Sequence, residues 1–185
     1  FQEALPGEQL LALTWTPGAY LGSCRYKLPE SLEDPVYPKL FQKFEEMNIG
    51  WFFYIGGNDS MDTVSKLSRY AEKISSDIRV IGIPKTIDND LWGTDMTFGF
   101  QSAVDIATQT IDCIHTTAAS HNRVFIVEIM GHKVGWLPLH AGVAGGADII
   151  LIPEIPYDID KVVEAINKRS KDGKGFTILA AAEGA

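Results

Sequence analysis

Short apolar segments that recur along the chain restrict most strongly what it can fold into. They are rich in Val, Ile, Leu or Phe and show little alternation with polar residues: 51–55, 79–83, 123–129, 148–152 and 176–182. Such runs are typical of strands that are covered on both faces, as in parallel sheets. Segments with apolar residues at spacings of three and four lie between them and predict helices. The pattern therefore predicts the α/β class, with a mostly parallel sheet, right-handed crossovers and helices on both faces.

Apolar residues on one face predict helices over 36–47, 61–74 and 98–119. A short helix rich in small residues is predicted over 136–144, and a further helix over 159–171. Asp59 or Ser60 is placed to cap the second of these helices. Residues 1–34 are expected to be irregular, because Pro6, Pro17 and Pro29 interrupt any helix there.

The composition is that of an ordinary globular chain with an acidic balance. With 185 residues, 45% of them hydrophobic, the chain can bury a sizeable core as one domain. A net charge of -8 argues against a nucleic-acid partner. The apolar runs fall far short of the ~20 residues of a membrane helix, and no signal-peptide pattern is visible. Cys24 and Cys113 have no metal or redox spacing, so we expect free thiols and a cytoplasmic location.

The segment from Pro84 to Asp90 joins an apolar strand to two acids and a lysine. Pro84 is expected to end the strand, which would place Lys85, Thr86, Asp88 and Asp90 in the crevice at its carboxyl end. Asp88 could act as a general base for a sugar hydroxyl, while Lys85 or a metal offsets charge on phosphoryl oxygens. Asp90 could hold magnesium or brace the loop. A solvated surface turn remains the alternative.

A second polar turn, Gly56-Gly57-Asn58-Asp59-Ser60, lies between a predicted strand and a predicted helix. Its glycines let the backbone approach a phosphate, and the helix would direct free amide groups and its positive end toward an anion. Paired glycines also form plain turns, so both interpretations stay open. The nucleotide-binding loops Gly-x-x-x-x-Gly-Lys-Ser/Thr and Gly-x-Gly-x-x-Gly are absent from the sequence.

A third turn, Met130-Gly-His-Lys-Val-Gly, could hold a phosphate or hydroxyl through its backbone amides, or be a plain turn. His132 has a pKa range suited to proton transfer, but a lone His is more often structural. Arg25 and Arg123 are candidate phosphate anchors or surface residues. Glu183 could bind sugar hydroxyls or only mark a strand end. All three turns are expected to leave the same end of one sheet and so to form one site.

Taken together, these motifs resemble the 6-phosphofructokinase family from about Leu21 to Ala185. The matching segments occur in the family's order: Leu-Gly-Ser-Cys-Arg25, Gly-Gly-Asn-Asp-Ser60, Pro-Lys-Thr-Ile-Asp-Asn-Asp90, Gly-Thr-Asp95, Ser-His-Asn-Arg123, Glu-Ile-Met-Gly131 and Pro-Glu154. The resemblance implies a Rossmann-like phosphofructokinase fold. It also implies transfer of a phosphoryl group to the 1-hydroxyl of fructose 6-phosphate, with Mg²⁺ required.

The resemblance also implies a role for each candidate residue. Asp88 matches the family's proton acceptor. The residues that match the substrate side are Thr86, Asp90, Met130, Gly131, His132 and Glu183, and those that match the donor side are Arg25, Gly57, Asp59 and Ser60. Arg123 matches an arginine that reaches a neighbouring subunit's substrate, which implies a homo-oligomer, a dimer or a tetramer. Asn58 stands where the family usually has a magnesium-binding Asp, and His132 where an Arg is usual.

Two positions bear on the phosphoryl donor. Members of the family that use ATP resemble Gly-Gly-Asp-Gly-Ser and Pro-Gly-Thr-Ile-Asp in these two segments. This chain has Asp59 and Lys85 where those patterns have a glycine. A carboxylate at Asp59 would crowd and repel the α-phosphate of ATP, while an ammonium at Lys85 can stabilise pyrophosphate during transfer. We therefore expect pyrophosphate as the donor and a reversible reaction. An ATP-dependent enzyme is one alternative, and a non-catalytic regulatory subunit, suggested by Asn58 and His132, is another.

The resemblance does not include the family's amino-terminal phosphate loop or its later substrate-binding residues. We expect residues 1–185 to be one phosphofructokinase-like α/β domain that is incomplete at both ends, and to be inactive alone.

Overall fold

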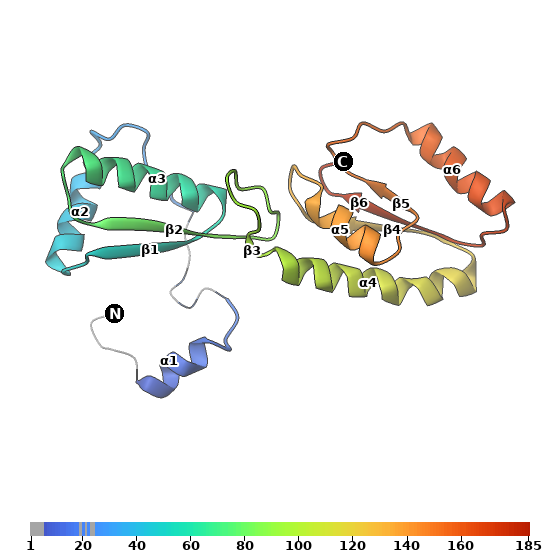
Figure 1. Cartoon of the computed structure of the whole chain (residues 1–185), viewed down its shortest axis with the longest axis horizontal. Coiled ribbons are helices and arrows are strands. Elements are labelled where there is room, and N and C mark those ends of the chain that lie inside the picture. Colours follow the sequence, from blue (N-terminus) through green and yellow to red (C-terminus); the bar gives the residue numbers. More distant parts are fainter. Residues whose placement is uncertain (1–5, 19, 21, 23–24) are drawn as a thin grey trace.

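The computed structural model describes residues 6–18, 20, 22 and 25–185, so Cys24 lies outside the described residues. Parallel strands are flanked by helices, which confirms the α/β class (Figure 1). The strands are β1 (Trp51–Gly56), β2 (Arg79–Thr86), β3 (Phe98–Gly99), β4 (Val124–Ile129), β5 (Ile149–Leu151) and β6 (Thr177–Ala182). They form two three-stranded sheets in the orders β1-β2-β3 and β4-β6-β5. The prediction of a single sheet is therefore wrong, since an apolar run does not encode which strand it pairs with.

The first sheet is covered on one face by α2 (Val36–Glu46) and α3 (Asn58–Lys73), both predicted. A core cluster joins the two helices to the sheet; it includes Tyr37, Phe41, Phe44, Leu67, Tyr70 and Ala71, with Phe52 and Val80 packed against it. The rings of Tyr37 and Tyr70 stack with their centroids 5.1 Å apart. Burial of this aromatic surface fixes α3 along β1 and β2.

Strand β2 continues past the residue that was expected to end it. Pro84 pairs with Gly56, and the strand runs on to Lys85 and Thr86. Proline is tolerated where a strand needs no donor on one side. The side of β2 away from β1 is paired with β3 only at Lys85 and Thr86. Both residues therefore belong to the strand end rather than to the turn.

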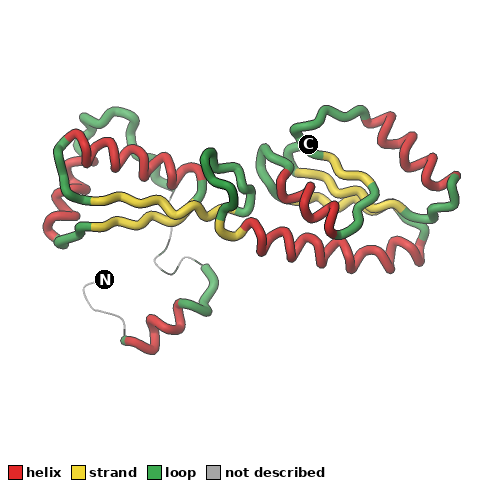
Figure 2. Tube along the Cα trace, viewed as in Figure 1, coloured by secondary structure: helices red, strands yellow, loops and turns green. Residues whose placement is uncertain are grey.

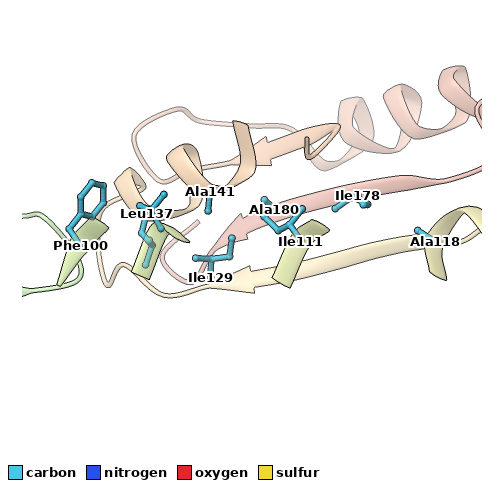
Figure 3. Packing of buried hydrophobic residues seen from close by; sticks show 9 residues of the cluster. Phe100, Ile111, Ala118, Ile129, Leu137, Ala141, Ile178 and Ala180 are labelled. Carbon is cyan, nitrogen blue, oxygen red and sulfur yellow. The ribbon is translucent and has the colours of Figure 1, made fainter. Parts of the chain in front are cut away.

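The second sheet has α4 (Phe100–His121) and α5 (Trp136–Ala144) on one face. Figure 3 shows the cluster they share with the sheet, in which Ile111, Ala141 and Ile178 are fully buried. Helix α6 (Ile159–Lys171) lies against the other face of this sheet, where Arg169 donates a hydrogen bond to the side chain of Thr177. Successive side chains of a strand alternate between faces, so Thr177 points away from Ile178.

The carboxyl ends of the two sheets face each other. Strands β1 and β2 run toward the middle of the molecule from one side, and β4 and β6 run toward it from the other (Figure 1). The loops that follow these strands meet in this region (Figure 2). The three polar turns are thus brought together across two sheets instead of along one.

Three local expectations differ from the structure. Residues Gly7–Leu13 form a short helix, α1, that starts directly after Pro6, a position where proline does not disturb a helix. Helix α3 begins at Asn58 with Gly57 as its N-cap and has no side-chain cap, so the predicted capping role of Asp59 or Ser60 is wrong. The helix starts earlier than predicted, which places both residues inside its first turn.

The outer faces of β1 and β4 are also not covered as expected. In β1, Trp51, Phe53 and Ile55 are 64%, 56% and 61% exposed. In β4, Ile126 is 69% exposed. Among the described strands, β6 comes nearest to the predicted burial on both faces. Cys113 is a free, exposed thiol, as predicted, and no helix in the described residues combines the length and apolarity needed to cross a membrane.

Candidate active site

The acidic turn begins at the end of β2. Thr86 is the last residue of the strand, and its Oγ1 accepts a hydrogen bond of 3.2 Å from the backbone N–H of Asp88. Asn89 follows in the left-handed region with φ 55°, a conformation that Asn adopts more readily than most residues. The chain therefore turns sharply between the two acids, Asp88 and Asp90.

Asp90 connects this turn to the start of α3. The side-chain Nδ2 of Asn58 donates a 2.7 Å hydrogen bond to Oδ2 of Asp90. The other oxygen, Oδ1, is buried and has no hydrogen-bond partner among the described residues. A buried carboxylate oxygen without a donor is costly, which marks this position as one that a cation or a donor group would stabilise.

The amino terminus of α3 lies beside the end of β2. A Cβ at Gly57 would be 3.7 Å from both the backbone oxygen of Lys85 and Cβ of Thr86. No side chain caps the helix, so its first amide groups and its positive dipole end remain available to an anion. The first turn of α3 therefore lies next to the end of β2, and an added Cβ at Gly57 would make only ordinary van der Waals contacts there.

Asp59 has a partner that the sequence did not reveal. Its Oδ1 lies 3.1 Å from Nζ of Lys27, and the two side chains are 79% and 74% exposed. An ion pair this open to solvent contributes little to stability. It does, however, place a second cation beside the donor-side residues.

The glycine turn after β4 is held by Glu183. The backbone N–H groups of Gly131 and His132 donate to its Oε1 at 3.1 and 2.5 Å. These two hydrogen bonds lower the pKa of the Glu183 carboxyl. Gly131 has φ 155°, and a Cβ there would come within 2.5 Å of the backbone oxygen of Val134, so only glycine fits. Glu183 therefore organises the turn that was expected to receive the substrate.

A second acid holds the other end of this turn. Oε1 of Glu154 accepts a 2.7 Å hydrogen bond from the backbone N–H of Gly135. The sequence showed Glu154 only as part of a Pro-Glu motif and gave it no role. No local pattern indicates this contact, because the two residues are brought together by the return of the chain after α5.

The electrostatics of Asp88 show that the turns of the two sheets meet. Partial burial is the main cause that raises the pKa of Asp88, and repulsion by Asp90 adds to it. Glu183 from the second sheet raises this pKa further, while a hydrogen bond between the side chains of Thr86 and Asp88 and the charge of His132 act in the opposite direction. Asp88 therefore senses charges from both sheets. A carboxylate with a raised pKa beside other acids is typical of a functional site.

Other predicted residues take different positions. Arg123 precedes β4 and is separated from the site by that six-residue strand, a distance of about 20 Å. The side chain of Ser60 lies over the backbone of Gly56, where an added Cβ would be 2.1 Å from its Oγ. Arg25 and Met130 are exposed, and no hydrogen bond of the structure ties either side chain to the acidic turn.

A hollow of about 590 Å³ adjoins the acidic turn. It is lined by residues 89–96 together with Phe100, Val134, Trp136 and His140. Its size is in the range of small-molecule sites. It lies between the loop that carries Asp90 and the residues that follow the glycine turn.

The described residues contain no group of three or more His, Cys, Asp and Glu side chains that could hold a metal ion. Asp90 and Asn58 are the oxygen-bearing side chains that the sequence associates with magnesium. Their contact leaves one carboxylate oxygen, Oδ1 of Asp90, and the carbonyl oxygen of Asn58 as candidate ligands.

Comparison with known proteins identifies the relatives of this chain. A sequence model of the family described as Phosphofructokinase matches residues 3–185. The chain is 51% identical over 146 residues to an ATP-dependent 6-phosphofructokinase of Spirochaeta thermophila, a match that covers 79% of this chain and 38% of that protein. It is 42% identical over 186 residues to ATP-dependent 6-phosphofructokinase 3 of Bacteroides thetaiotaomicron, which covers 98% of this chain and 54% of that protein.

Solved structures also include a similar fold. The crystal structure of a pyrophosphate-dependent phosphofructokinase from Marinobacter aquaeolei superposes with a TM-score of 0.83 at 38% identity. The match covers 97% of this chain and 46% of that one. The chain thus spans about half the length, or less, of the relatives it matches.

Proposed function

This chain belongs to the phosphofructokinase family, and we propose that it carries catalytic residues of an enzyme that transfers a phosphoryl group from pyrophosphate to the 1-hydroxyl of fructose 6-phosphate. The observation that carries the proposal is the position of Asp88. It lies where the turns of both sheets meet, and its surroundings keep it more basic than an ordinary aspartate. A general base works best when its pKa approaches the working pH.

In the proposed reaction, the 1-hydroxyl oxygen of the sugar attacks one phosphorus of pyrophosphate. A new phosphorus–oxygen bond forms as the bridging bond of pyrophosphate breaks, and inorganic phosphate leaves. The hydroxyl proton passes to Asp88. Lys85 and the uncapped amino terminus of α3 offset the charge on the phosphoryl oxygens.

The glycine turn is proposed to bind the sugar phosphate. The backbone N–H groups of Gly131 and His132 donate to Glu183 and so order the turn, and we propose that the side chain of His132 contacts the phosphate. Met130, Thr86 and a free oxygen of Glu183 complete the proposed substrate side. A preformed turn of this kind reduces the ordering cost of binding.

Magnesium fits the residues that are present. Mg²⁺ in phosphoryl-transfer sites is commonly held by one or two carboxylates together with substrate phosphates and water. Asp90 offers a buried, unpartnered oxygen, and Asn58 offers a neutral carbonyl in place of a second charge. Bound Mg²⁺ would neutralise negative charge on the phosphate oxygens of the donor.

The choice of donor is the finer part of the proposal. Asp59 and Lys85 favour pyrophosphate on steric and electrostatic grounds. The similar structure from Marinobacter aquaeolei is named a pyrophosphate-dependent phosphofructokinase. ATP is the second candidate, because the curated relatives cited above are named ATP-dependent. Lys27 partly offsets the charge of Asp59, so we attribute most of the discrimination to the size of Asp59 and to Lys85.

Initial rates of the full-length protein with fructose 6-phosphate and either donor test this choice. We expect turnover with pyrophosphate to exceed turnover with ATP by at least about tenfold in kcat/KM, equivalent to about 1.4 kcal/mol. Replacing both Asp59 and Lys85 by Gly should reverse the preference. Faster turnover with ATP in the unchanged protein would establish the second candidate.

A non-catalytic subunit gives a different result in the same experiment. It would bind fructose 6-phosphate and turn over neither donor, and Asn58→Asp would restore turnover if the missing charge were the cause.

The position of Arg123, about 20 Å from the site along β4, supports the proposal that the protein is a homo-oligomer, a dimer or a tetramer. The free thiol of Cys113 supports the separate proposal that the protein works in the cytoplasm. In such an oligomer Arg123 would act in a neighbouring subunit. Mixing full-length subunits that carry Arg123→Ala with subunits that carry Asp88→Ala should then produce some intact sites and restore activity. Unrestored activity in demonstrated hybrids would contradict this role.

A further inference from the structure

The loop that carries Asp88 and Asp90 is closed at its base by one buried polar residue. The chain leaves β2 after Thr86 and returns in β3 at Phe98, and Thr86 pairs with Gly99 across the two strands. Thr97 stands at the point of return and is only 3% exposed. A threonine this deeply buried is expected to satisfy its polar groups inside the protein.

Thr97 contacts both ends of the acidic turn. Its hydroxyl donates a 2.7 Å hydrogen bond to the backbone oxygen of Thr86. Its backbone N–H donates a 2.8 Å hydrogen bond to Oδ1 of Asn89. A hydroxyl has one proton, so the 3.2 Å approach of Thr97 Oγ1 to the same Asn89 oxygen does not add a second donated bond. Asp88 lies between these two anchor points.

Asn89 supplies the other half of the closure. Its backbone is left-handed, with φ 55°, and its Nδ2 lies 3.4 Å from the backbone oxygen of Asp95. The side chain therefore spans the loop from one limb to the other. Because the backbone of Asn89 directly links Asp88 to Asp90, fixing Asn89 limits the positions that both carboxylates can take.

We infer that Thr97 and Asn89 are positioning residues for phosphoryl transfer, which hold the Asp88 carboxylate where it can reach the sugar hydroxyl. Neither side chain belongs to the proposed sugar-phosphate turn, which is held separately by Glu183 and Glu154. Loosening the loop should therefore affect the chemical step more than substrate binding. The inference rests on the proposed function, since it assigns these residues to that reaction.

Replacement of the Thr97 hydroxyl provides the sharpest test. Thr97→Val keeps the branched shape and removes the donor to Thr86, whereas Thr97→Ser keeps the hydroxyl. In the full-length protein we expect Thr97→Val to lower kcat by about 10- to 100-fold, because small misplacements of a catalytic group have effects of this order. The KM for fructose 6-phosphate should stay within about threefold, and Thr97→Ser should recover most of the rate.

Thr110→Val is a matched control. The Thr110 hydroxyl also donates to a backbone oxygen, that of Ile106 at 2.8 Å, but it is exposed on α4 and remote from the loop. It should leave kcat and KM unchanged. Asn89→Gly tests the second anchor, because Gly accepts a positive φ and removes only the side chain. We expect it to lower kcat in the same way as Thr97→Val.

The outcomes separate this inference from the proposed function. If the unchanged protein turns over neither donor, the proposed function fails. If it is active but Thr97→Val behaves like Thr110→Val, or Thr97→Ser is as impaired as Thr97→Val, the positioning role is wrong. Hydrogen exchange gives a readout that needs no turnover: amides of residues 87–97 should exchange faster in Thr97→Val than in Thr97→Ser, and equal rates would overturn the inference.

Discussion

Replacement of Asp88 by Asn should abolish most of the activity while making the protein more stable. The amide is nearly the same shape as the carboxylate but cannot accept the proton of the sugar hydroxyl. General base catalysis contributes about 10² to 10⁴ in rate, so kcat of the full-length protein should fall by at least that factor. The KM for fructose 6-phosphate should change little, because Glu183 and the glycine turn are untouched.

The gain in stability follows from the direction of the pKa shift. Burial and the neighbouring Asp90 raise the pKa of Asp88 in the folded protein above its usual value of 3.8. The free energy of unfolding therefore falls as the pH rises from the pKa of Asp88 in the unfolded chain to its higher pKa in the folded protein. This loss of stability persists at neutral pH. Asp88→Asn removes the charge and the penalty. Its melting temperature should exceed that of the unchanged protein at pH 7, and the difference should shrink in acid below about pH 3.8.

Steady-state kinetics and thermal melts at several pH values provide the assay. Asp105→Asn on the exposed surface of α4 is a control of the same chemistry and should alter neither quantity. A mild loss of kcat would remove Asp88 as the base. A large loss together with a lower melting temperature at pH 7 would show that the variant disturbs the fold, and would refute the electrostatic reasoning.

Further predictions concern the metal, the turn and the core. Asn58→Asp would place a second carboxylate where the Asn58 amide now contacts Asp90 at 2.7 Å. The variant should therefore bind Mn²⁺ more tightly in the absence of the phosphoryl donor, as measured by electron paramagnetic resonance. Unchanged Mn²⁺ affinity would exclude this pair as a metal site. Glu183→Ala removes the carboxylate that accepts hydrogen bonds from the backbone N–H groups of Gly131 and His132. In initial-rate measurements it should raise the KM for fructose 6-phosphate more than it lowers kcat. An unchanged KM would show that Glu183 does not hold the turn for the substrate. Ile111→Ala, at a position with 0% exposure, should lower the free energy of unfolding by about 2 to 5 kcal/mol in denaturant titrations, and a loss below about 1 kcal/mol would contradict the packing.

Much of the fold follows from local patterns in the sequence. The helices α5 and α6 have the predicted bounds, because the residues that favour each helix and the turns that end it are close together in the sequence. The distribution of strands between two sheets could not be predicted in this way. It depends on the long helix α4, which carries the chain from β3 to the far end of the second sheet (Figure 1).

The contacts among the candidate site residues could not be predicted from the sequence. The sequence identified Asp88, Asp90 and Glu183 as chemically informative, and the structure brings them together. The sequence gave no sign that Glu183 accepts hydrogen bonds from the glycine turn or that Thr97 closes the acidic loop. Each of these contacts joins two segments that are separated in the sequence. Pro84 misled the prediction because its effect depends on whether a neighbouring strand needs its missing N–H.

A crystal structure of the full-length protein with fructose 6-phosphate and a non-hydrolysable pyrophosphate analogue would show whether Asp88 contacts the reacting hydroxyl. With Asp88 as the base, the sugar's 1-hydroxyl oxygen should lie about 2.6 to 3.2 Å from a carboxylate oxygen of Asp88, or one water away. The analogue should lie beside Lys85 and the amino terminus of α3. A sugar bound with its 1-hydroxyl oxygen far from Asp88 would show that Asp88 is not the base.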